Sequence, residues 1–351
     1  MTAARTLWYT RCPLPTASGV AIERGLLDAA FAPLGIAVQS LNASLDRQVR
    51  EAHFDHGQPG LFRQGGMIPP IWSRSRGADT LVIATGWIDE YQAVIALPDS
   101  GIRDGGDLRG RRLGVPCRPG EQIDYWRAMC LRGYHSALQL AGLAPTDVEF
   151  VALPIHEGQI PTGGASQRGS LWHGAPRARR QSREALALVR GEVDAIYTAS
   201  PAGAQLTAFL GARIVVDIGA APSPAMRSNN QVPAILTVDG NLARTQPGLV
   251  VRYLAALFDA ADWARAHPLE ADTILSEDVG TTREWLHAAH GGDVAARLAP
   301  MLAPAHVQAV AAQKDFLLGL GLLENDFDLQ AWIAPEFIEA AAATRGSHAA
   351  A

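Results

Sequence analysis

The sequence predicts an α/β protein with two lobes, and three observations lead to this prediction. Short apolar runs alternate with segments of helical spacing, which is typical of parallel or mixed sheets flanked by helices. The pattern restarts after Pro98, and the apolar run at 233–238 leads back to the first part of the chain. The length of 351 residues exceeds the usual size of one domain. We expect residues 1–98 and 232–351 to form lobe I and the inserted residues 99–231 to form lobe II, with a ligand cleft between them.

The elements can be assigned in order along the chain. In lobe I we expect strands at 6–10, 35–41, 80–85 and 93–97, and helices at 19–31 and 46–52 and from 68 onward. In lobe II we expect strands at 112–116, 148–153, 191–197 and 213–218, and helices at 121–141 and 183–189. After Gln246 the chain is nearly all helical, with helices at 248–266, 306–321 and 329–344. Residues 163–180 are rich in Gly, Ser and Arg and predict a mobile loop, and whether it closes over a ligand stays open.

The composition is that of an ordinary globular protein, with 48 % hydrophobic and 19 % charged residues and a net charge of −5. Basic residues do not cluster along one face, so no nucleic-acid partner is expected. No apolar stretch approaches the length of a transmembrane helix, so no membrane partner is expected either. The N-terminus lacks the apolar core of a secretory signal, which favours a cytoplasmic protein, and we expect a monomer.

The three cysteines are Cys12, Cys117 and Cys130. Their odd number, without metal-ligand spacing, argues against a disulfide framework and against a zinc site. We expect packing roles for Cys117 and Cys130, which fall in a predicted strand end and a predicted helix. The sequence contains no glycine-rich dinucleotide fingerprint and no phosphate-binding loop, so we expect neither a metal nor an organic cofactor.

The segment 53–70 (HFDHGQPGLFRQGGMIPP) carries the best candidate for a ligand site. Gly65 and Gly66 allow a ligand to approach their N–H groups, and the pair Pro69-Pro70 suits the first turn of a following helix. A helix N-terminus preceded by glycines, with Arg63 beside it, predicts a site for a small oxyanion. The alternative interpretation is a tight turn with a solvated Arg63 and a capping His53.

Four segments resemble the solute-binding proteins of nitrate, sulfonate and taurine uptake. They are 108–115 (LRGRRLGV), 191–195 (GEVDA), 247–250 (PGLV) and 261–263 (ADW). This resemblance implies the type II periplasmic-binding-protein fold, in which the ligand cleft lies between the two lobes.

Three further segments resemble the 2′-hydroxybiphenyl-2-sulfinate desulfinases of dibenzothiophene desulfurisation. They are 9–15 (YTRCPLP), 53–70 and 331–337 (AWIAPEF), and the similarity extends over nearly the whole chain. The resemblance implies a catalytic site of Cys12, His53 and Arg63, with Gly66 as a backbone donor. We expect Gly65, Gly66, His56, Phe54 and Trp87 to bind the substrate, although Phe54 and Trp87 could equally pack in the core, as could Trp8, Tyr9 and Phe62.

The predicted chemistry is the hydrolytic release of sulfite from an aryl sulfinate. Arg63 would hold two sulfinate oxygens as a fork. Cys12 could act in two ways, as a thiolate that attacks sulfur or as a thiol that protonates the ring carbon. His53 would tune Cys12 or position water, and neither route requires a metal or a cofactor.

The sequence also departs from the desulfinase pattern in the walls of the expected pocket. Residues 198–203 contain no aromatic residue, the region 126–138 is shortened with Tyr134 in place of a tryptophan, and His56 stands where the family has a tyrosine. The organic group of the substrate therefore stays open. Two alternatives are a binding protein for a sulfonate-like or nitrate-like anion, serving a transporter, and an enzyme of pyrimidine biosynthesis with the same fold.

Overall fold

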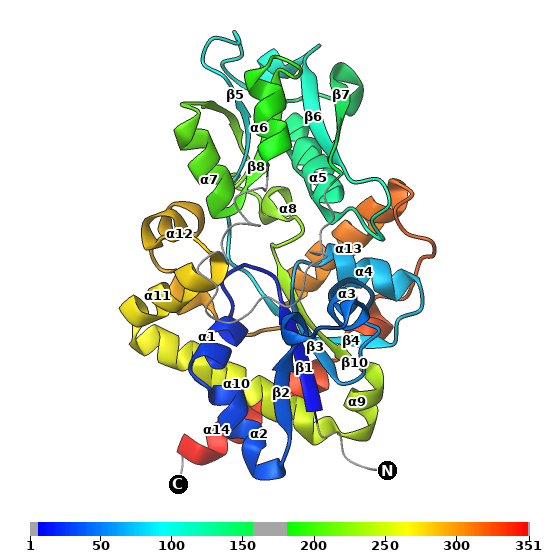
Figure 1. Ribbon diagram of the computed structural model, residues 1–351, viewed down its shortest axis with the longest axis vertical. Coiled ribbons are helices and arrows are strands. Elements are labelled where there is room, and N and C mark those ends of the chain that lie inside the picture. Colours follow the sequence, from blue (N-terminus) through cyan, green and yellow to red (C-terminus); the bar gives the residue numbers. More distant parts are fainter. Residues whose placement is uncertain (1–5, 157–180, 350–351) are drawn as a thin grey trace.

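The computed structural model describes residues 6–156 and 181–349, so the predicted loop at 163–180 lies outside the described residues. Two five-stranded sheets form the centres of two lobes, as Figure 1 shows. The strand order is β2-β1-β3-β10-β4 in the first sheet and β7-β6-β8-β5-β9 in the second. The prediction of a two-lobed α/β protein is confirmed.

The first sheet is parallel on one side and antiparallel on the other. Strand β1 runs parallel to β2 and β3, whereas β10 runs antiparallel to β3 and β4. The strands are β1 (Thr6–Arg11), β2 (Ala37–Ser40), β3 (Leu61–Gly65), β4 (Thr80–Gly86) and β10 (Ala234–Asp239). The sequence did not predict β3, the central strand of this sheet, all of whose residues are buried.

The second sheet repeats this plan. Strand β6 runs parallel to β7 and β8, and β5 runs antiparallel to β8 and β9. The strands are β5 (Gln92–Ala96), β6 (Arg112–Cys117), β7 (Glu149–Pro154), β8 (Ala195–Ala199) and β9 (Arg213–Asp217). In each sheet the antiparallel partner of the parallel strands is the strand that follows a crossing between the lobes, β5 or β10.

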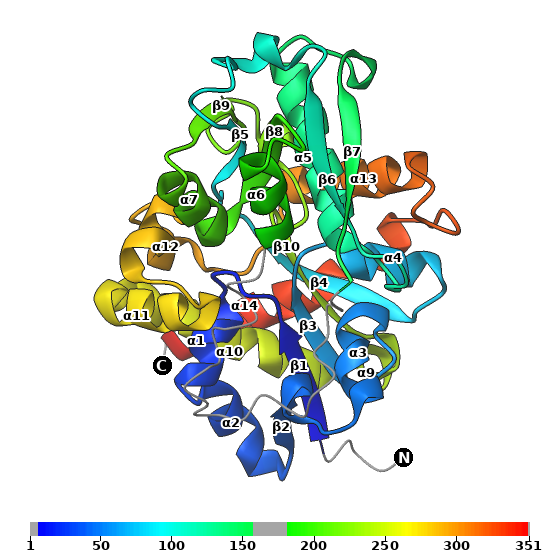
Figure 2. The same cartoon turned by 45° about the horizontal axis from the view of Figure 1, so that its top comes forward.

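Helices cover the sheets on both sides (Figures 1 and 2). In the first part of the chain they are α1 (Ala17–Glu23), α2 (Leu26–Phe31), α3 (Arg47–Asp55) and α4 (Ile68–Ser75). Those that follow are α5 (Tyr125–Leu140), α6 (Ser182–Val189), α7 (Ser200–Phe209), α8 (Pro224–Arg227) and α9 (Gly240–Thr245). The C-terminal part contains α10 (Pro247–Ala266), α11 (Pro268–Val279), α12 (Arg283–His290), α13 (Pro304–Gly319) and α14 (Pro335–Ala349). The helix expected at 19–31 is divided into α1 and α2 because Gly25 adopts a left-handed conformation with φ +67°.

Two large apolar cores hold these layers together. One packs α1, α10 and α14 against the first sheet, where Leu7 and Phe62 are fully buried. The other contains Ile71 of α4, Leu113 of β6 and Tyr134 of α5, so it includes residues of both lobes. Burial of this shared core ties lobe I to lobe II, because exposing its apolar surface to water would be costly.

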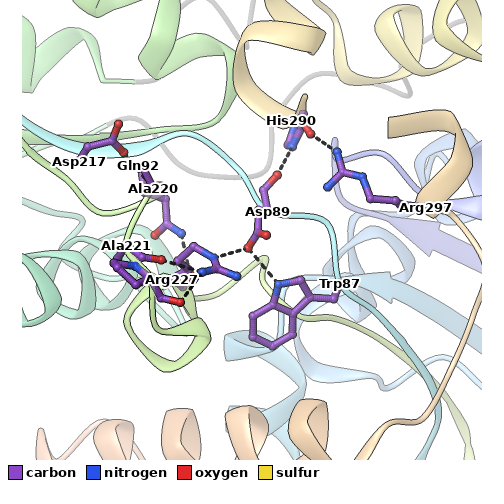
Figure 3. Close-up of polar contacts among 10 residues, drawn as sticks. Trp87, Asp89, Gln92, Asp217, Ala220, Ala221, Arg227, His290 and Arg297 are labelled. Atoms are coloured by element: carbon purple, nitrogen blue, oxygen red, sulfur yellow. Dashed lines mark hydrogen bonds and ion pairs between the residues drawn. The ribbon is translucent and has the colours of Figure 1, made fainter. Parts of the chain in front are cut away.

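The chain passes between the sheets twice, and one predicted boundary needs correction. Strand β5 pairs with β8 and β9, so the apolar run at 93–97 belongs to the second sheet. The first crossing therefore lies between β4 and β5, at residues 87–91, and not at Pro98. The return crossing precedes β10, in agreement with the expected position near Pro233. An ion pair between Asp89 and Arg227, with Asp89 Oδ1 2.8 Å from Arg227 Nε, joins the two crossings (Figure 3).

Candidate active site

The site is built on two neighbouring parallel strands. The register of β1 and β3 places Thr10 beside Arg63, and the Cys12 N–H donates to the Gln64 carbonyl at 3.0 Å. Alternate residues of a strand share one face of the sheet, so Thr10 and Cys12 face the same way. Both strands end here, at the carboxyl edge where open α/β sheets bind ligands. The strand pairing therefore brings Cys12 and Arg63 together although 51 positions separate them.

His53 approaches Cys12 from the last turn of α3. This helix begins after Asp46, whose carboxylate accepts a hydrogen bond from the Gln48 N–H at 2.9 Å. The imidazole Nε2 lies 3.6 Å from Cys12 Sγ, and Nδ1 lies 2.9 Å from the hydroxyl oxygen of Thr10. The buried Thr10 hydroxyl therefore fixes the orientation of the ring whichever nitrogen carries the proton.

Arg63 is fully buried, and each of its guanidinium nitrogens has an acceptor within the chain. Nε donates to the His53 carbonyl at 2.9 Å, Nη1 donates to the Gly66 carbonyl at 2.8 Å, and Nη2 lies 3.6 Å from Cys12 Sγ. Burial lowers the pKa of Arg63, and negative charge at Cys12 acts in the opposite direction. The alternative of a solvated Arg63 is wrong. The binding of two sulfinate oxygens by Arg63 stays a prediction, because Nη2 here faces the cysteine sulfur.

The two glycines make room for other side chains of the site. A Cβ atom on Gly65 would overlap Cys12 Sγ, and a Cβ atom on Gly66 would lie 2.6 Å from the Asn230 amide. Both positions therefore require glycine for steric reasons. That Gly65 and Gly66 also donate their N–H groups to a ligand stays a prediction.

The N-terminus of α4 is not the open oxyanion-binding site that the sequence suggested. The Met67 N–H donates to the Asn230 backbone carbonyl at 2.7 Å, and the Ile68 N–H donates to the Asn230 side-chain oxygen at 2.9 Å. Pro69 and Pro70 have no N–H group. The donors of this first turn are thus occupied or absent, and the expected binding of an oxyanion by N–H groups of this helix end is not supported.

Phe54 joins the site to the other lobe. Its ring packs edge-on against His53 with 4.9 Å between centroids, and it stacks on Tyr125 at 6.1 Å. Tyr125 is the first residue of α5 in lobe II, and it interacts electrostatically with Arg63. The stacked pair therefore forms an aromatic wall between the two lobes, next to His53.

His56 lies within the electrostatic influence of Arg63 and has its own hydrogen-bond partners. It ends α3 in a left-handed conformation with φ 59°. Its Nε2 lies 2.9 Å from the Thr237 hydroxyl and its Nδ1 lies 3.1 Å from the Ser73 hydroxyl. Burial, assisted by the charge of Arg63, lowers the pKa of His56 to about 3, so the ring is neutral at physiological pH. Both ring nitrogens are engaged, which favours a structural role over the predicted substrate contact.

Trp87 lies in the crossing between the lobes (Figure 3). Its indole N–H donates to Asp89 Oδ1 at 2.9 Å, and its ring packs on His306 with 5.2 Å between centroids. Trp87 therefore packs against the ion pair of the crossings and is not brought together with Cys12, His53 and Arg63 by these contacts. Phe62 stacks on Tyr253 within the core of lobe I, with 3.9 Å between centroids.

The other two cysteines lie in a buried part of α5 and at the end of β6. Cys130 is buried, as predicted, and burial raises the pKa of its thiol well above the usual value. Cys117 is half-buried at the end of β6. Among residues 6–156 and 181–349, no three His, Cys, Asp or Glu side chains gather as ligands for a metal ion. No helix in the same described part is long and apolar enough to cross a membrane.

Three residues of the site were not predicted: Thr10, Tyr125 and Asn230. Thr10 could have been found, because it precedes Cys12 by two positions on a predicted strand and therefore shares its face. Tyr125 and Asn230 come from distant parts of the chain, and no local pattern in the sequence indicates their position.

Comparisons with known proteins show which proteins this chain resembles. The sequence matches no family model. It is 31 % identical to the 2′-hydroxybiphenyl-2-sulfinate desulfinase of Rhodococcus erythropolis, over 95 % of this chain and 92 % of that protein. A crystal structure of a cysteine-to-serine mutant of the enzyme DszB in complex with biphenyl-2-sulfinic acid is 30 % identical, with a TM-score of 0.76 over 97 % of this chain and 99 % of that one.

The fold extends to more distant proteins. The periplasmic aliphatic sulphonate-binding protein SsuA of Escherichia coli has a TM-score of 0.64 at 16 % identity, over 95 % of this chain and 92 % of that chain. This likeness shows the fold alone, and it confirms the expected fold of the type II periplasmic binding proteins.

Proposed function

The chain belongs to the 2′-hydroxybiphenyl-2-sulfinate desulfinase family, and we propose that it cleaves the carbon–sulfur bond of an aryl sulfinate through Cys12 and releases sulfite. One observation supports the proposal that Cys12 is the catalytic nucleophile. Its sulfur lies 3.6 Å from His53 Nε2 and 3.6 Å from Arg63 Nη2, so an imidazole and a guanidinium nitrogen both face it. A cysteine sulfur with an imidazole and a guanidinium in reach is the arrangement that nucleophilic catalysis by cysteine uses.

The first step is the attack of the Cys12 thiolate on the sulfinate sulfur. The new sulfur–sulfur bond forms as the bond from sulfur to the ring carbon breaks, and the ring carbon takes up one proton. His53 is placed to supply that proton, since its Nε2 faces Cys12 and its Nδ1 is held by Thr10. The products of this step are the arene and a Cys12–S–SO₂⁻ adduct.

The second step is hydrolysis. Water adds to the sulfur of the adduct, the sulfur–sulfur bond breaks, and bisulfite leaves while Cys12 returns to the thiolate. The second proton of the water returns to His53, which gave one to the ring carbon in the first step. The electron pair of the carbon–sulfur bond stays on the ring carbon, so neither step needs an external oxidant or reductant. The alternative is a Cys12 thiol that protonates the ring carbon, and it would place the same sulfur beside Arg63 Nη2.

The aryl character of the substrate is supported by the walls of the site. Phe54 and Tyr125 offer two parallel rings beside His53, and an aromatic group can stack on them. The relatives support the same class, since one is named for 2′-hydroxybiphenyl-2-sulfinate and another was crystallised with biphenyl-2-sulfinic acid.

We also place the enzyme in the cytoplasm and expect a monomer to be active. All three cysteines are free thiols, and the proposed chemistry requires a reduced Cys12, which a reducing compartment maintains. Every side chain of the proposed site comes from one chain, so the reaction needs no partner subunit.

Release of sulfite from 2′-hydroxybiphenyl-2-sulfinate by the purified protein tests this function. The parent and Cys117→Ser are expected to turn over, and Cys12→Ser is expected to be inactive while folded. Cys117 is the matched control because it is also a half-buried free thiol at a strand end. Equal rates for Cys12→Ser and the parent would disprove a catalytic Cys12. A folded parent that binds sulfinates without releasing sulfite would instead be an anion-binding protein.

A further inference from the structure

A small polar recess lies beside the aromatic wall and contains two buried acceptors without partners. Within the described residues, the side-chain oxygens of Gln181 and Gln231 are buried and make no hydrogen bond. Both residues line one recess of about 30 Å³. The other residues that line it are Arg118, Tyr125, Trp126, Met129 and Ser200. Buried acceptors are nearly always paired in folded proteins, so two in one recess indicate a group that binds there.

The orientation of Gln181 is fixed by the fold. Its side-chain amide donates to the Ala199 carbonyl at 3.1 Å, which leaves the carbonyl oxygen of the side chain as the group still to be satisfied. Gln181 and Ser200 both adopt left-handed backbone conformations, with φ of 64° and 67°. Non-glycine residues hold such conformations at a cost, and they concentrate at ligand-binding sites.

Gln231 is fixed by the turn that also builds the catalytic site. Asn229 and Val232 exchange two backbone hydrogen bonds of 2.9 and 3.0 Å around it. Its neighbour Asn230 accepts from the N–H groups at the start of α4. The position of the Gln231 side chain is thereby tied to the segment that follows Arg63.

Two residues that line the recess also contact the surroundings of Cys12. Tyr125 stacks on Phe54, the neighbour of His53. Gln181 also lines a groove of about 600 Å³ that includes Pro13, the residue after Cys12. A groove of this size accommodates a small organic molecule. A sulfinate held at Cys12 can therefore extend its organic group along the groove toward Gln181.

We infer that Gln181 and Gln231 recognise a hydroxyl group on the organic part of the substrate. This inference rests on the proposed function and assigns to it two residues that select between aryl sulfinates with and without a hydroxyl group. The recess has the size of one water molecule or one hydroxyl group and is too small for a ring. A hydroxyl can donate to a glutamine oxygen, and its own oxygen can accept from the Arg118 guanidinium. An ionised oxygen has no proton to donate and would be repelled by two carbonyl oxygens.

The test compares 2′-hydroxybiphenyl-2-sulfinate with biphenyl-2-sulfinate, which lacks the hydroxyl. In the parent we expect kcat/KM for the hydroxylated substrate to be higher by about 10-fold, the effect of one buried hydrogen bond. In Gln181→Met and Gln231→Met the ratio should fall toward one, mainly through loss of rate on the hydroxylated substrate. Gln139→Met, on the exposed side of α5, is the control and should keep the parental ratio.

A binding measurement keeps this inference separate from the proposed function. Cys12→Ser should bind the hydroxylated sulfinate about 10-fold more tightly than the other, by calorimetry, and Cys12→Ser with Gln181→Met should bind both equally. A parent that turns over both substrates equally, or glutamine variants that keep the parental ratio, would overturn the inference and leave the function standing. Tighter binding of the hydroxylated sulfinate by a parent that releases no sulfite would overturn the proposed desulfinase function. It would still support recognition of the hydroxyl group by the two glutamines. If the recess holds only a structural water, all variants will show the parental ratio.

Discussion

Cys12 and Gly65 face each other across two parallel strands, and the space that a Cβ atom on Gly65 would need is filled by Cys12 Sγ. The absence of one methyl group thus gives the sulfur its place between His53 and Arg63. This relationship explains in steric terms why a glycine follows Gln64 on a strand whose other residues carry large side chains.

Replacing Gly65 by alanine should displace the cysteine sulfur. We expect Gly65→Ala to lower kcat by at least about 100-fold, because a shift of about 1 Å at a reacting atom has effects of this size. The loss is measured by sulfite release and by the rate at which iodoacetamide alkylates Cys12. Gly248→Ala is the control, since a Cβ there meets open space on the exposed side of α10. Parental activity in Gly65→Ala would show that the sulfur is not confined as described.

Thr10 should act as a positioning residue for His53. Thr10→Val keeps the shape of the side chain but removes the hydroxyl oxygen that lies 2.9 Å from His53 Nδ1. We expect kcat to fall by about 10- to 100-fold and the pH profile of kcat to shift, since the ring loses the partner that fixes its tautomer. Thr10→Ser should restore both. A valine variant with a parental pH profile would argue against this role.

Arg63 should not be replaceable by lysine. Its three nitrogens serve the His53 carbonyl, the Gly66 carbonyl and the Cys12 sulfur, and an ammonium group cannot reproduce this fork. We expect Arg63→Lys to lose about 100-fold in kcat and about 2–3 kcal/mol of unfolding free energy in urea, because buried acceptors are left without donors.

Arg76→Lys is the matched control for that experiment. Arg76 pairs with Glu324 on the surface and is about half exposed, with 46 % of its side chain accessible. Its substitution should cost less than about 1 kcal/mol. Similar losses in Arg63→Lys and Arg76→Lys would contradict the burial of Arg63 in the site.

The buried His56 should make the protein sensitive to mild acid. Its pKa is about 3 in the folded protein and near its ordinary value of 6.5 in the unfolded chain, so the unfolded state takes up more protons between these values. Stability should therefore fall as the pH drops from 6.5 toward 3. His56→Gln keeps a donor and an acceptor but cannot titrate. Between pH 7 and pH 4 its unfolding free energy should therefore fall by about 3 kcal/mol less than that of the parent. Parallel urea curves for parent and variant would contradict this account.

The sequence predicted most of the strands because their apolar runs are local patterns, but it missed β3. Fully buried parallel strands are usually apolar throughout, and Arg63 and Gln64 interrupt that pattern. The polar residues are there because their partners come from other elements, such as the Cys12 sulfur for Arg63 and the Ser18 hydroxyl for Gln64. The polar residues that identify the site are therefore also the reason why the sequence did not predict the strand.

The placement of β5 could not be predicted for a different reason. The run at 93–97 looks like any other buried strand, and its sheet is decided by pairing with β8 and β9, about a hundred residues later. Likewise, no local pattern around Trp87 indicates that its indole N–H binds Asp89, which pairs with Arg227 at the crossing between the lobes. Cys12, His53 and Arg63 could be predicted from the resemblance, whereas their contacts with Thr10 and Tyr125 required the fold.

The mass of the Cys12 peptide, from enzyme quenched during turnover of 2′-hydroxybiphenyl-2-sulfinate, tests the central claim most directly. The account predicts that Cys12 transiently gains the mass of one SO₂, that Cys117 does not, and that the adduct decays as bisulfite appears. Bisulfite release at the full rate with Cys12 unmodified at every quench time would contradict a nucleophilic Cys12.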